Sequence, residues 1–281
     1  MTAALELDGV SVDIAGRRVV DGVSLTVAAG EVVGVVGANG CGKTTAIRGA
    51  LGLIRLQTGE ARLAGRPVSG LGEADRARLA GYLPQERRVG WNLPAWRVAA
   101  LGAPHLPPAK ARAIAMDALA EVDMTVLADR GVFDMSGGER ARVLLARLLA
   151  TGAPLLIADE PAAGLDPDAQ FLVADLLRAR AARGGAVLVT LHDLTLAARS
   201  CDRLVVMTKG GVVATGTPRQ ALTRDIVREA FRLDGGLIET QAGLVVAAHR
   251  QSSFDRLYGL TGSSALAAPT TDTMPSPDPP P

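Results

Sequence analysis

The chain has 281 residues, with 30 basic and 29 acidic side chains and a formal net charge of +1. This length suits a large α/β domain with subdomains, and the balanced charge excludes a global attraction to nucleic acid or to an anionic membrane surface. Charges, glycine or proline interrupt every apolar stretch before the roughly 18 to 20 residues that a spanning helix needs. The two cysteines, Cys41 and Cys201, fit a reducing compartment. Residues 1–9 lack the basic and apolar segments of a secretory signal.

The first part of the chain predicts an antiparallel sheet followed by a buried strand and a helix. Leu5–Val12 and Val19–Val27 cluster β-branched residues between Gly-rich turns, as antiparallel strands do. Glu31–Val36 is a short apolar run typical of a buried parallel strand. From Thr44 to Leu53 the apolar spacing becomes helical. A strand at Gly59–Leu63, a helix at Arg76–Ala80 and a strand at Gly81–Gln85 are expected next.

The rest of the chain alternates helices and strands. Val98–Leu149 is mainly helical, with a break at Ser136–Gly138 that caps a new helix. The later elements are expected to be strands at Leu155–Ala158 and Ala186–Thr190, a helix at Asp168–Arg183, and a hairpin over Leu204–Thr215. This alternation predicts an α/β sheet with parallel strands, and the helical middle predicts an inserted subdomain. Ser263–Pro281 is rich in Ala, Pro, Thr and Ser and is expected to be disordered.

One segment between a predicted strand and a predicted helix matches the phosphate-loop pattern G-x-x-x-x-G-K-[ST]. Its residues are Gly37, Ala38, Asn39, Gly40, Cys41, Gly42, Lys43 and Thr44. Glycines let backbone N–H groups curl around phosphates, and the following helix adds its positive dipole end. We expect Lys43 to reach the β and γ phosphates of ATP, Thr44 to ligate Mg²⁺ and Thr45 to bind the α phosphate. A chance match is expected in about one chain of this length in a hundred.

A second segment places two adjacent carboxylates, Asp159 and Glu160, directly after the apolar run Leu155–Ala158. Open α/β sheets bind ligands at this end of their strands. Alone, such a pair is more often a solvated strand end. Together with the phosphate loop it predicts that Asp159 holds Mg²⁺ through water and that Glu160 acts as general base in ATP hydrolysis.

A third segment, Met135–Glu139, opens the helix Arg140–Leu149 with Ser-Gly-Gly. In order and spacing, the whole motif series resembles that of ABC transporter ATPases over about Leu5–Thr223. The series consists of the loop at Gly37, then Gln85, Ser136–Glu139, Asp159–Glu160, Gly164–Asp166 and His192. The resemblance implies a P-loop NTPase (RecA-like) core with an antiparallel β subdomain and an inserted α-helical subdomain.

The resemblance also implies roles for individual residues. Gln85 is expected to sense Mg²⁺ and the attacking water. Ser136, Gly137 and Gly138 are expected to contact the γ phosphate of ATP held by a second copy, so that catalysis requires a head-to-tail dimer. Asp166 would link the two sites across the dimer. His192 would be the switch histidine near the γ phosphate, although a lone histidine is more often structural.

Two positions depart from the usual family pattern. Glu139 places a carboxylate where a neutral amide is commoner. We expect this to modulate the function of the signature segment without changing its role, because the Ser and Gly donors remain. The aromatic residue that usually stacks on adenine is absent, because the corresponding segment reads Asp13-Ile14-Ala15-Gly16. Ile14 offers only an apolar contact, which predicts weaker or less base-selective nucleotide binding.

Finer resemblance is to the importer ATPases that serve iron–siderophore, haem and cobalamin uptake. It is carried by Tyr82–Gln85 with Trp91, Val98–Gly102, Leu191–Arg199 and Gly216–Pro218. It implies a second copy of the chain, a polytopic permease that contacts Arg87–Leu106, and indirectly a substrate-binding protein, at the cytoplasmic face of the inner membrane. The alternatives are that this segment is an ordinary surface loop and that Trp91 and Trp96 belong to the core.

Two alternatives to this function stay open. One is an importer ATPase for another substrate, such as a metal ion. The other is a soluble non-transport ABC ATPase that clamps a macromolecule. In either case we expect residues 1–240 to form the ATPase domain, with a helical subdomain at about 86–153. Residues 241–262 would form a C-terminal extension and residues 263–281 a disordered tail.

Overall fold

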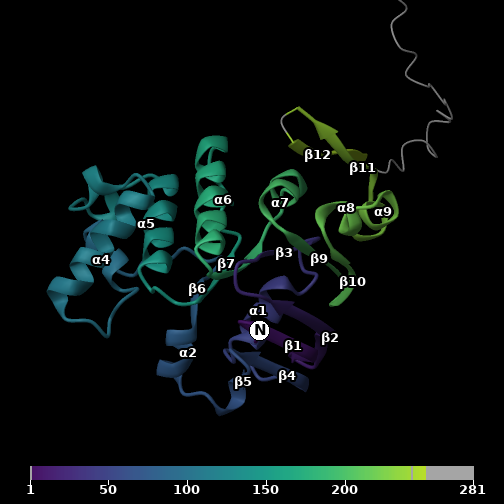
Figure 1. Ribbon diagram of the computed structural model, residues 1–281, viewed down its shortest axis with the longest axis horizontal. Coiled ribbons are helices and arrows are strands. Elements are labelled where there is room, and N and C mark those ends of the chain that lie inside the picture. The colour runs from purple at the N-terminus through teal and green to yellow at the C-terminus, as the bar shows by residue number, and fades with distance from the viewer. Residues whose placement is uncertain (1, 242, 251–281) are drawn as a thin grey trace, which may run out of the picture.

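A central sheet of six strands carries the fold in the computed structural model, which describes residues 2–241 and 243–250. Its strands run in the order β10-β9-β3-β8-β7-β6 (Figure 1). Their bounds are β3 (Val32–Gly37), β6 (Ala80–Leu83), β7 (Leu155–Asp159), β8 (Ala186–Thr190), β9 (Arg203–Thr208) and β10 (Gly211–Gly216). All neighbours pair in parallel except β9 and β10. The predicted α/β class with a parallel sheet is confirmed.

A second sheet, antiparallel, lies against one face of the central sheet (Figure 1). It has the order β2-β1-β4-β5 and is built from β1 (Leu5–Ile14), β2 (Arg17–Val27), β4 (Thr58–Leu63) and β5 (Arg66–Pro67). Helix α1 (Lys43–Ala50) packs between the two sheets. The antiparallel strands predicted from the sequence are therefore confirmed.

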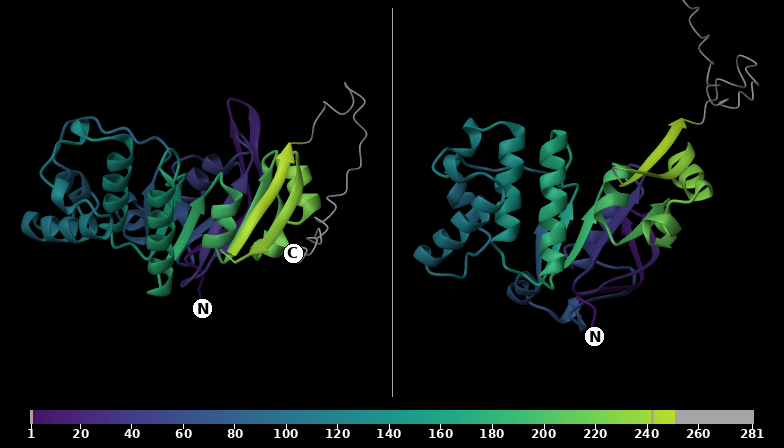
Figure 2. Two further views of the ribbon diagram at one scale, coloured as in Figure 1. Left: turned by 90° about the horizontal axis from the view of Figure 1, so that it is seen from above. Right: turned by 45° about the horizontal axis from the view of Figure 1, so that its top comes forward.

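A helical lobe is inserted between β6 and β7 and stands to one side in every view (Figures 1 and 2). It contains α3 (Ala95–Ala100), α4 (Pro108–Glu121) and α5 (Gly137–Leu149), with 3₁₀ turns η2 (Thr125–Leu127) and η3 (Val132–Asp134). A 3₁₀ turn η1 (Val68–Gly70) and helix α2 (Glu73–Leu79) precede β6. Within the described part of the chain, no helix is both long and apolar enough to cross a membrane.

The C-terminal part of the described chain contains helices and a hairpin. The sequence patterns predict the helix at Asp168–Arg183 but not the hairpin. The elements of this part are α6 (Pro167–Ala182), α7 (Leu194–Ser200), α8 (Pro218–Ala221), α9 (Arg224–Phe231), β11 (Leu233–Thr240) and β12 (Gly243–Arg250). The hairpin β11-β12 packs on α9 and α7 (Figure 2). This hairpin lies on both sides of residue 240, where the ATPase domain is expected to end. The predicted tail at 263–281 lies outside the described residues.

Alternation along the central strands explains how the sheet is buried on both faces. Val33 and Val35 of β3 face the antiparallel sheet and α1, whereas Val32 and Val36 face the helices on the other side. The same alternation recurs in β7, β8 and β9. Because side chains of a strand point to opposite faces with period two, a strand covered on both faces reads as a continuous apolar run. The loops at the strand ends are thereby anchored on a rigid base.

Candidate nucleotide site

The phosphate loop joins β3 to α1, and two of its glycines are required by close contacts. A Cβ on Gly37 would lie 2.3 Å from the carbonyl oxygen of Met207. Gly42 has a φ of +104°, and a Cβ there would lie 2.7 Å from the carbonyl oxygen of Val19. Any side chain at these positions would push the loop away from β9 or β2, so the loop geometry depends on glycine.

Lys43 begins helix α1 and turns its side chain back over the loop. The side chain is buried, and Nζ donates hydrogen bonds to the carbonyl oxygens of Gly37 at 2.8 Å and Ala38 at 3.4 Å. Thr44 and Thr45 follow in the first turn and are half-buried. The start of the helix thus combines a cation, two hydroxyls and the positive end of the helix dipole, which together suit a phosphate group.

The outer part of the loop is open to solvent, whereas Cys41 is not. Ala38, Asn39 and Gly40 are exposed. The amide of Cys41 donates to the carbonyl oxygen of Ala38 at 3.2 Å, and its own carbonyl accepts from the amide of Gly210 at 3.1 Å. Burial raises the pKa of the Cys41 thiol, so this side chain fills the loop and is a poor nucleophile.

Asp159 ends β7 directly beside Thr190, the last residue of β8, because the two are paired in the parallel register. The Thr190 hydroxyl donates to Asp159 Oδ1 at 2.6 Å and accepts from the amide of Glu160 at 2.8 Å. Asp159 Oδ2 is buried and has no hydrogen-bond partner among the residues that the structure describes. Buried polar atoms are almost always satisfied, so this oxygen points to a ligand.

The donor set fits Mg²⁺ when phosphate oxygens complete it. Among the described residues there is no group of three or more His, Cys, Asp or Glu side chains that would hold a metal ion by itself. Mg²⁺ is usually bound through one or two carboxylates together with water and substrate phosphates. The unpartnered oxygen of Asp159 and the hydroxyl of Thr44 are ligands of that kind.

Glu160 lies just beyond the end of β7, and both of its carboxylate oxygens are engaged. Gln85 Nε2 donates to Oε2 at 2.8 Å, and His192 Nε2 contacts Oε1. The Glu160 residue is only 8 % exposed, and its φ of +53° is in the left-handed region, which a non-glycine residue rarely adopts. A pocket of about 120 Å³ borders Glu160 and His192, which is enough for water.

The signature segment lies at the start of α5, in the helical lobe, and Figure 1 shows α5 set apart from α1. The Ser136 hydroxyl accepts from the amide of Glu139 at 3.2 Å, and the Glu139 carboxylate accepts from the amide of Ser136 at 2.7 Å. This reciprocal capping box lowers the pKa of Glu139, chiefly through the bond from the Ser136 backbone. Among the described residues, a Cβ on Gly137 would meet no atom within 4 Å, and a Cβ on Gly138 would lie 3.8 Å from Leu165.

Asp166 caps helix α6 and is exposed. Its carboxylate accepts from the amide of Ala169 at 2.9 Å. The structure therefore brings together Gln85, Asp159, Glu160 and His192, whereas the hydrogen bonds of Asp166 and of the signature segment stay local.

The end of the β1–β2 hairpin offers no aromatic ring to a nucleotide base. Ile14 is the last residue of β1, is 46 % exposed, and pairs with Arg17 across the turn. The backbone of Val19, further along β2, touches Gly42 of the loop. The apolar side chain exposed at the end of β1 is therefore an isoleucine.

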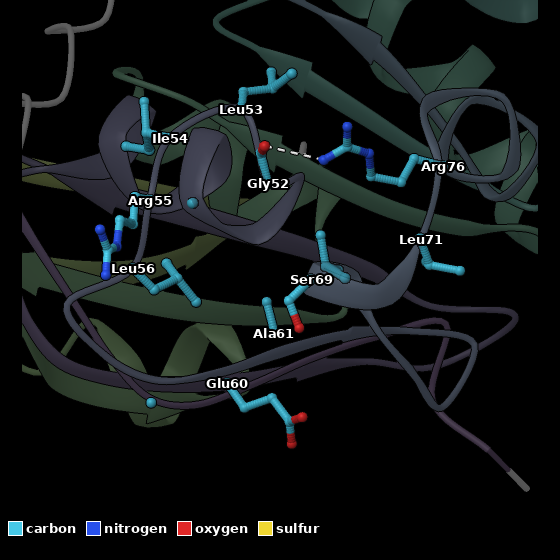
Figure 3. A pocket seen from close by; sticks show the side chains of 13 residues that line it. Gly52, Leu53, Ile54, Arg55, Leu56, Glu60, Ala61, Ser69, Leu71 and Arg76 are labelled. Carbon is cyan, nitrogen blue, oxygen red and sulfur yellow. Dashed lines mark hydrogen bonds between the residues drawn. The ribbon is translucent and has the colours of Figure 1, made fainter.

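A larger cavity lies at the opposite end of α1, away from the motif residues. It has a volume of about 630 Å³ and is lined by residues such as Leu53, Leu56 and Glu60 (Figure 3). Arg76 reaches into its wall and donates to the carbonyl oxygen of Gly52 at 3.0 Å and to that of Leu51 at 3.4 Å. These bonds satisfy carbonyls just after the helix end. None of the loop or carboxylate motif residues lines this cavity, so size does not identify the nucleotide site here.

Two residues at the carboxylate cluster were not singled out from the sequence. In the sequence, Thr190 is the last residue of the expected strand Ala186–Thr190, and its bridging hydroxyl follows from the β7–β8 register. Arg87 contacts the main chain after β7, which no sequence pattern signals. Trp91 is 75 % exposed, so the alternative that it belongs to the core is wrong. Trp96 is half-buried and packs against the core, and the guanidinium groups of Arg97 and Arg112 lie over its ring.

The sequence of the chain is similar to sequences of known proteins. The ABC transporter family model matches residues 20–163. The hemin import ATP-binding protein of Myxococcus xanthus is 40% identical over 247 residues, which cover 84% of this chain and 92% of that protein. The cobalamin import ATP-binding protein of Halobacterium salinarum is 40% identical over 232 residues, which cover 81% of this chain but only 58% of that protein.

A solved structure extends the likeness to the fold. A chain from an ABC transporter described as of the metal-chelate type, in an inward-facing conformation, superimposes with a TM-score of 0.76 at 22% identity. The match covers 90% of this chain and 99% of that one. The family model, the two relatives and the shared fold lead to one conclusion: the chain belongs to the ABC transporter family.

Proposed function

We propose that the chain is the ATP-hydrolysing subunit of an ABC importer and that it powers uptake through a separate permease. The observation that carries the proposal is the shared position of the phosphate loop and the carboxylate cluster. The loop follows β3, and the cluster follows β7 and β8, which are neighbours in the order β3-β8-β7. Open α/β sheets bind ligands at this edge. The names of the relatives, which are import ATP-binding proteins, support the transport role.

Nucleotide binding is assigned to the loop from Gly37 to Thr45. We assign its backbone amides to the β phosphate and the Thr45 hydroxyl to the α phosphate. The Lys43 ammonium, which lies over the Gly37 carbonyl, turns to the β and γ phosphates. These charge-assisted bonds are stronger than the neutral bonds they replace.

Hydrolysis is assigned to Glu160 as general base. A water held beside its carboxylate attacks the γ phosphorus, its proton passes to Glu160, and the bond to the bridging β–γ oxygen breaks, which leaves ADP and phosphate. Gln85 and His192, which contact the two carboxylate oxygens, orient the carboxylate and the water. When bound, Mg²⁺ neutralises phosphate charge, and we assign Thr44, Gln85 and, through water, Asp159 as its ligands.

The second half of the site is assigned to another copy of the chain. Ser136, Gly137 and Gly138 at the start of α5 supply hydroxyl and backbone donors for the γ phosphate bound by the opposite subunit, and Asp166 links the two sites. Closure of this head-to-tail dimer on two ATP molecules drives the permease, and hydrolysis reopens it.

The membrane partner is assigned to the segment Arg87–Leu106. Trp91 within it is 75 % exposed, and exposed tryptophans are enriched at protein interfaces. The chain would then lie at the cytoplasmic face of the inner membrane as a peripheral subunit. Because relatives are named for hemin and cobalamin import, we assign an iron–siderophore, haem or cobalamin-type metal chelate as the cargo, delivered by a substrate-binding protein.

The decisive experiment compares Glu160→Gln with Glu229→Gln, a change at an exposed glutamate of α9. We expect Glu160→Gln to keep ATP binding, to accumulate an ATP-bound dimer in light scattering, and to lose at least about 100-fold in kcat. Glu229→Gln should match the wild type. Near-normal turnover of Glu160→Gln would refute the general-base role. A wild type that binds ATP but does not turn it over, alone or with its permease, would refute the proposed function.

A further inference from the structure

Arg87 holds the main chain of the residues that follow β7. Its Nη2 donates to the carbonyl oxygens of both Glu160 and Pro161, each at 2.8 Å. The side chain is half-buried, and burial lowers the pKa of its guanidinium. Burying a cation is costly unless it is well hydrogen-bonded, so the two carbonyl bonds explain why the guanidinium stays there.

The main chain that Arg87 holds is in an unusual conformation. Glu160 has a φ of +53°, and a non-glycine residue keeps such a conformation only where its surroundings impose it. Its amide donates to the Thr190 hydroxyl, and its carbonyl also accepts from the amide of Ala163 at 3.2 Å. The direction of the Glu160 carboxylate therefore depends on contacts to its backbone as well as to its side chain.

Arg87 also ties this backbone to the segment that carries Gln85. The two residues are separated by one position, and both reach Glu160, one through its carboxylate and one through its carbonyl. The neighbouring Glu86 and Arg88 point outward, where they form a solvent-exposed ion pair at 3.8 Å. One short segment thus fixes the side chain and the main chain of the same residue.

We infer that Arg87 is a positioning residue for ATP hydrolysis, which sets the orientation of Glu160 and links it to the conformation of the segment after Gln85. This inference rests on the proposed function of Glu160 as general base. Displacement of the segment would reorient the base through the two carbonyl bonds, without any change in the phosphate loop.

The test uses the full chain with Arg87→Ala, Arg87→Lys and the control Arg78→Ala, which removes an exposed arginine of α2, outside the segment assigned to the permease. We expect Arg87→Ala to lower kcat about 10- to 100-fold while KM for ATP changes by less than about threefold, because the hydrogen bonds of Arg87 go to Glu160 and Pro161. Arg87→Lys should restore part of kcat, since it keeps a donor of the same charge. Arg78→Ala should match the wild type.

Hydrogen–deuterium exchange of the peptide covering residues 160–165 gives a readout that does not depend on turnover. Arg87→Ala should exchange faster in this peptide and normally elsewhere. A kcat equal to that of Arg78→Ala, or a loss of kcat accompanied by faster exchange throughout the chain, would overturn the inference. If neither the wild type nor Arg78→Ala hydrolysed ATP, the proposed function would fail, and because the inference rests on it, the positioning role of Arg87 would fail with it, whatever the exchange data show.

Discussion

Two parts of the motif series differ in how their polar groups are hydrogen-bonded. One lies at the carboxyl edge of the central sheet and the other at the start of helix α5. At the sheet edge, Gln85 reaches Glu160 across 75 residues of sequence, and His192 reaches the same carboxylate. At the start of α5, the hydrogen bonds of Ser136 and Glu139 join these two residues to each other within one turn.

This difference indicates which part of the candidate site a single chain forms by itself. The sheet edge has a carboxylate held by residues that follow the two strands beside β7, as the proposed general base requires. The start of α5 has donors at a helix N-terminus, which suit an anion, but Figure 1 places them in a different lobe from α1. In the proposed head-to-tail dimer, the loop of each copy would meet the start of α5 of the other.

The strongest way to break this comparison is complementation between two inactive variants. Lys43→Ala removes the loop cation, and Ser136→Arg blocks the start of α5. Each alone should lose at least about 100-fold in kcat. An equimolar mixture should recover about a quarter of the wild-type rate, because random pairing makes half of the dimers mixed, and each mixed dimer has one intact site.

The control for complementation is a mixture of Lys43→Ala with Glu160→Gln. These two changes affect the same half of the site, so a mixed dimer has one defect in each site and activity should not return. If the Lys43→Ala and Ser136→Arg mixture stays inactive although pull-down shows mixed dimers, the division of the site between two chains is wrong.

Substitutions of Thr190 test the sheet edge alone, and we expect them to have an intermediate effect on kcat. Its buried hydroxyl donates to Asp159 and accepts from the amide of Glu160. Thr190→Val keeps the shape but leaves both groups unpartnered, which should cost about 2 kcal/mol of stability and about tenfold in kcat. Thr190→Ser keeps the hydroxyl and should stay within about threefold of the wild type. Chemical denaturation and steady-state kinetics measure both effects, and equal behaviour of the two variants would contradict the hydrogen-bonding role.

The alternation of strands and helices in the sequence predicted the α/β class with a parallel sheet, because such patterns are local. The candidate residues were identified through the resemblance of the whole motif series, and their roles stay predictions. The β3 run, the glycines of the loop and the Ser-Gly-Gly cap are each visible within about ten residues. The contacts around Glu160 are different in kind. The bond from Arg87 to its carbonyl joins residues 73 positions apart, and no spacing rule states which arginine of a loop turns inward.

The C-terminal hairpin shows the same limit at the level of secondary structure. β11 contains Gly235 and Gly236, which are depleted in strands, so its composition does not favour a strand. It is stabilised by pairing with β12 and by packing on α9. Tertiary contacts therefore override a weak local preference, and only the fold reveals the strand.

Ile14 tests how the loop half of the site treats the nucleotide base, with a smaller effect. Ile14 is half-exposed at the end of β1 and contributes only apolar surface. Ile14→Tyr should tighten ATP binding about fivefold, since stacking of a base on an aromatic ring contributes about 1 kcal/mol or more. The wild type should bind ATP and GTP with similar affinity, as calorimetry can measure. A strong adenine preference of the wild type would show that another residue reads the base.

Glu139 gives the smallest expected effect and sharpens the description of the α5 half. The capping bond lowers the pKa of its carboxyl below the ordinary value of 4.5, so its electrostatic contribution to stability is present above that value and is lost as the pH falls through the lowered pKa. Glu139→Ala should destabilise the protein by about 0.5 kcal/mol at pH 7. Glu139→Gln can still accept from the Ser136 amide and should lose less. The difference in the free energy of unfolding between wild type and Glu139→Gln should shrink as the pH is lowered from 6 to 3 if ionisation of Glu139 matters, as denaturation curves at each pH can show.

Both Glu139 variants should keep kcat within about twofold, because the donors at this helix start come from Ser136 and the backbone and not from the carboxylate. A large loss of kcat in Glu139→Gln would mean that the carboxylate itself acts across the dimer.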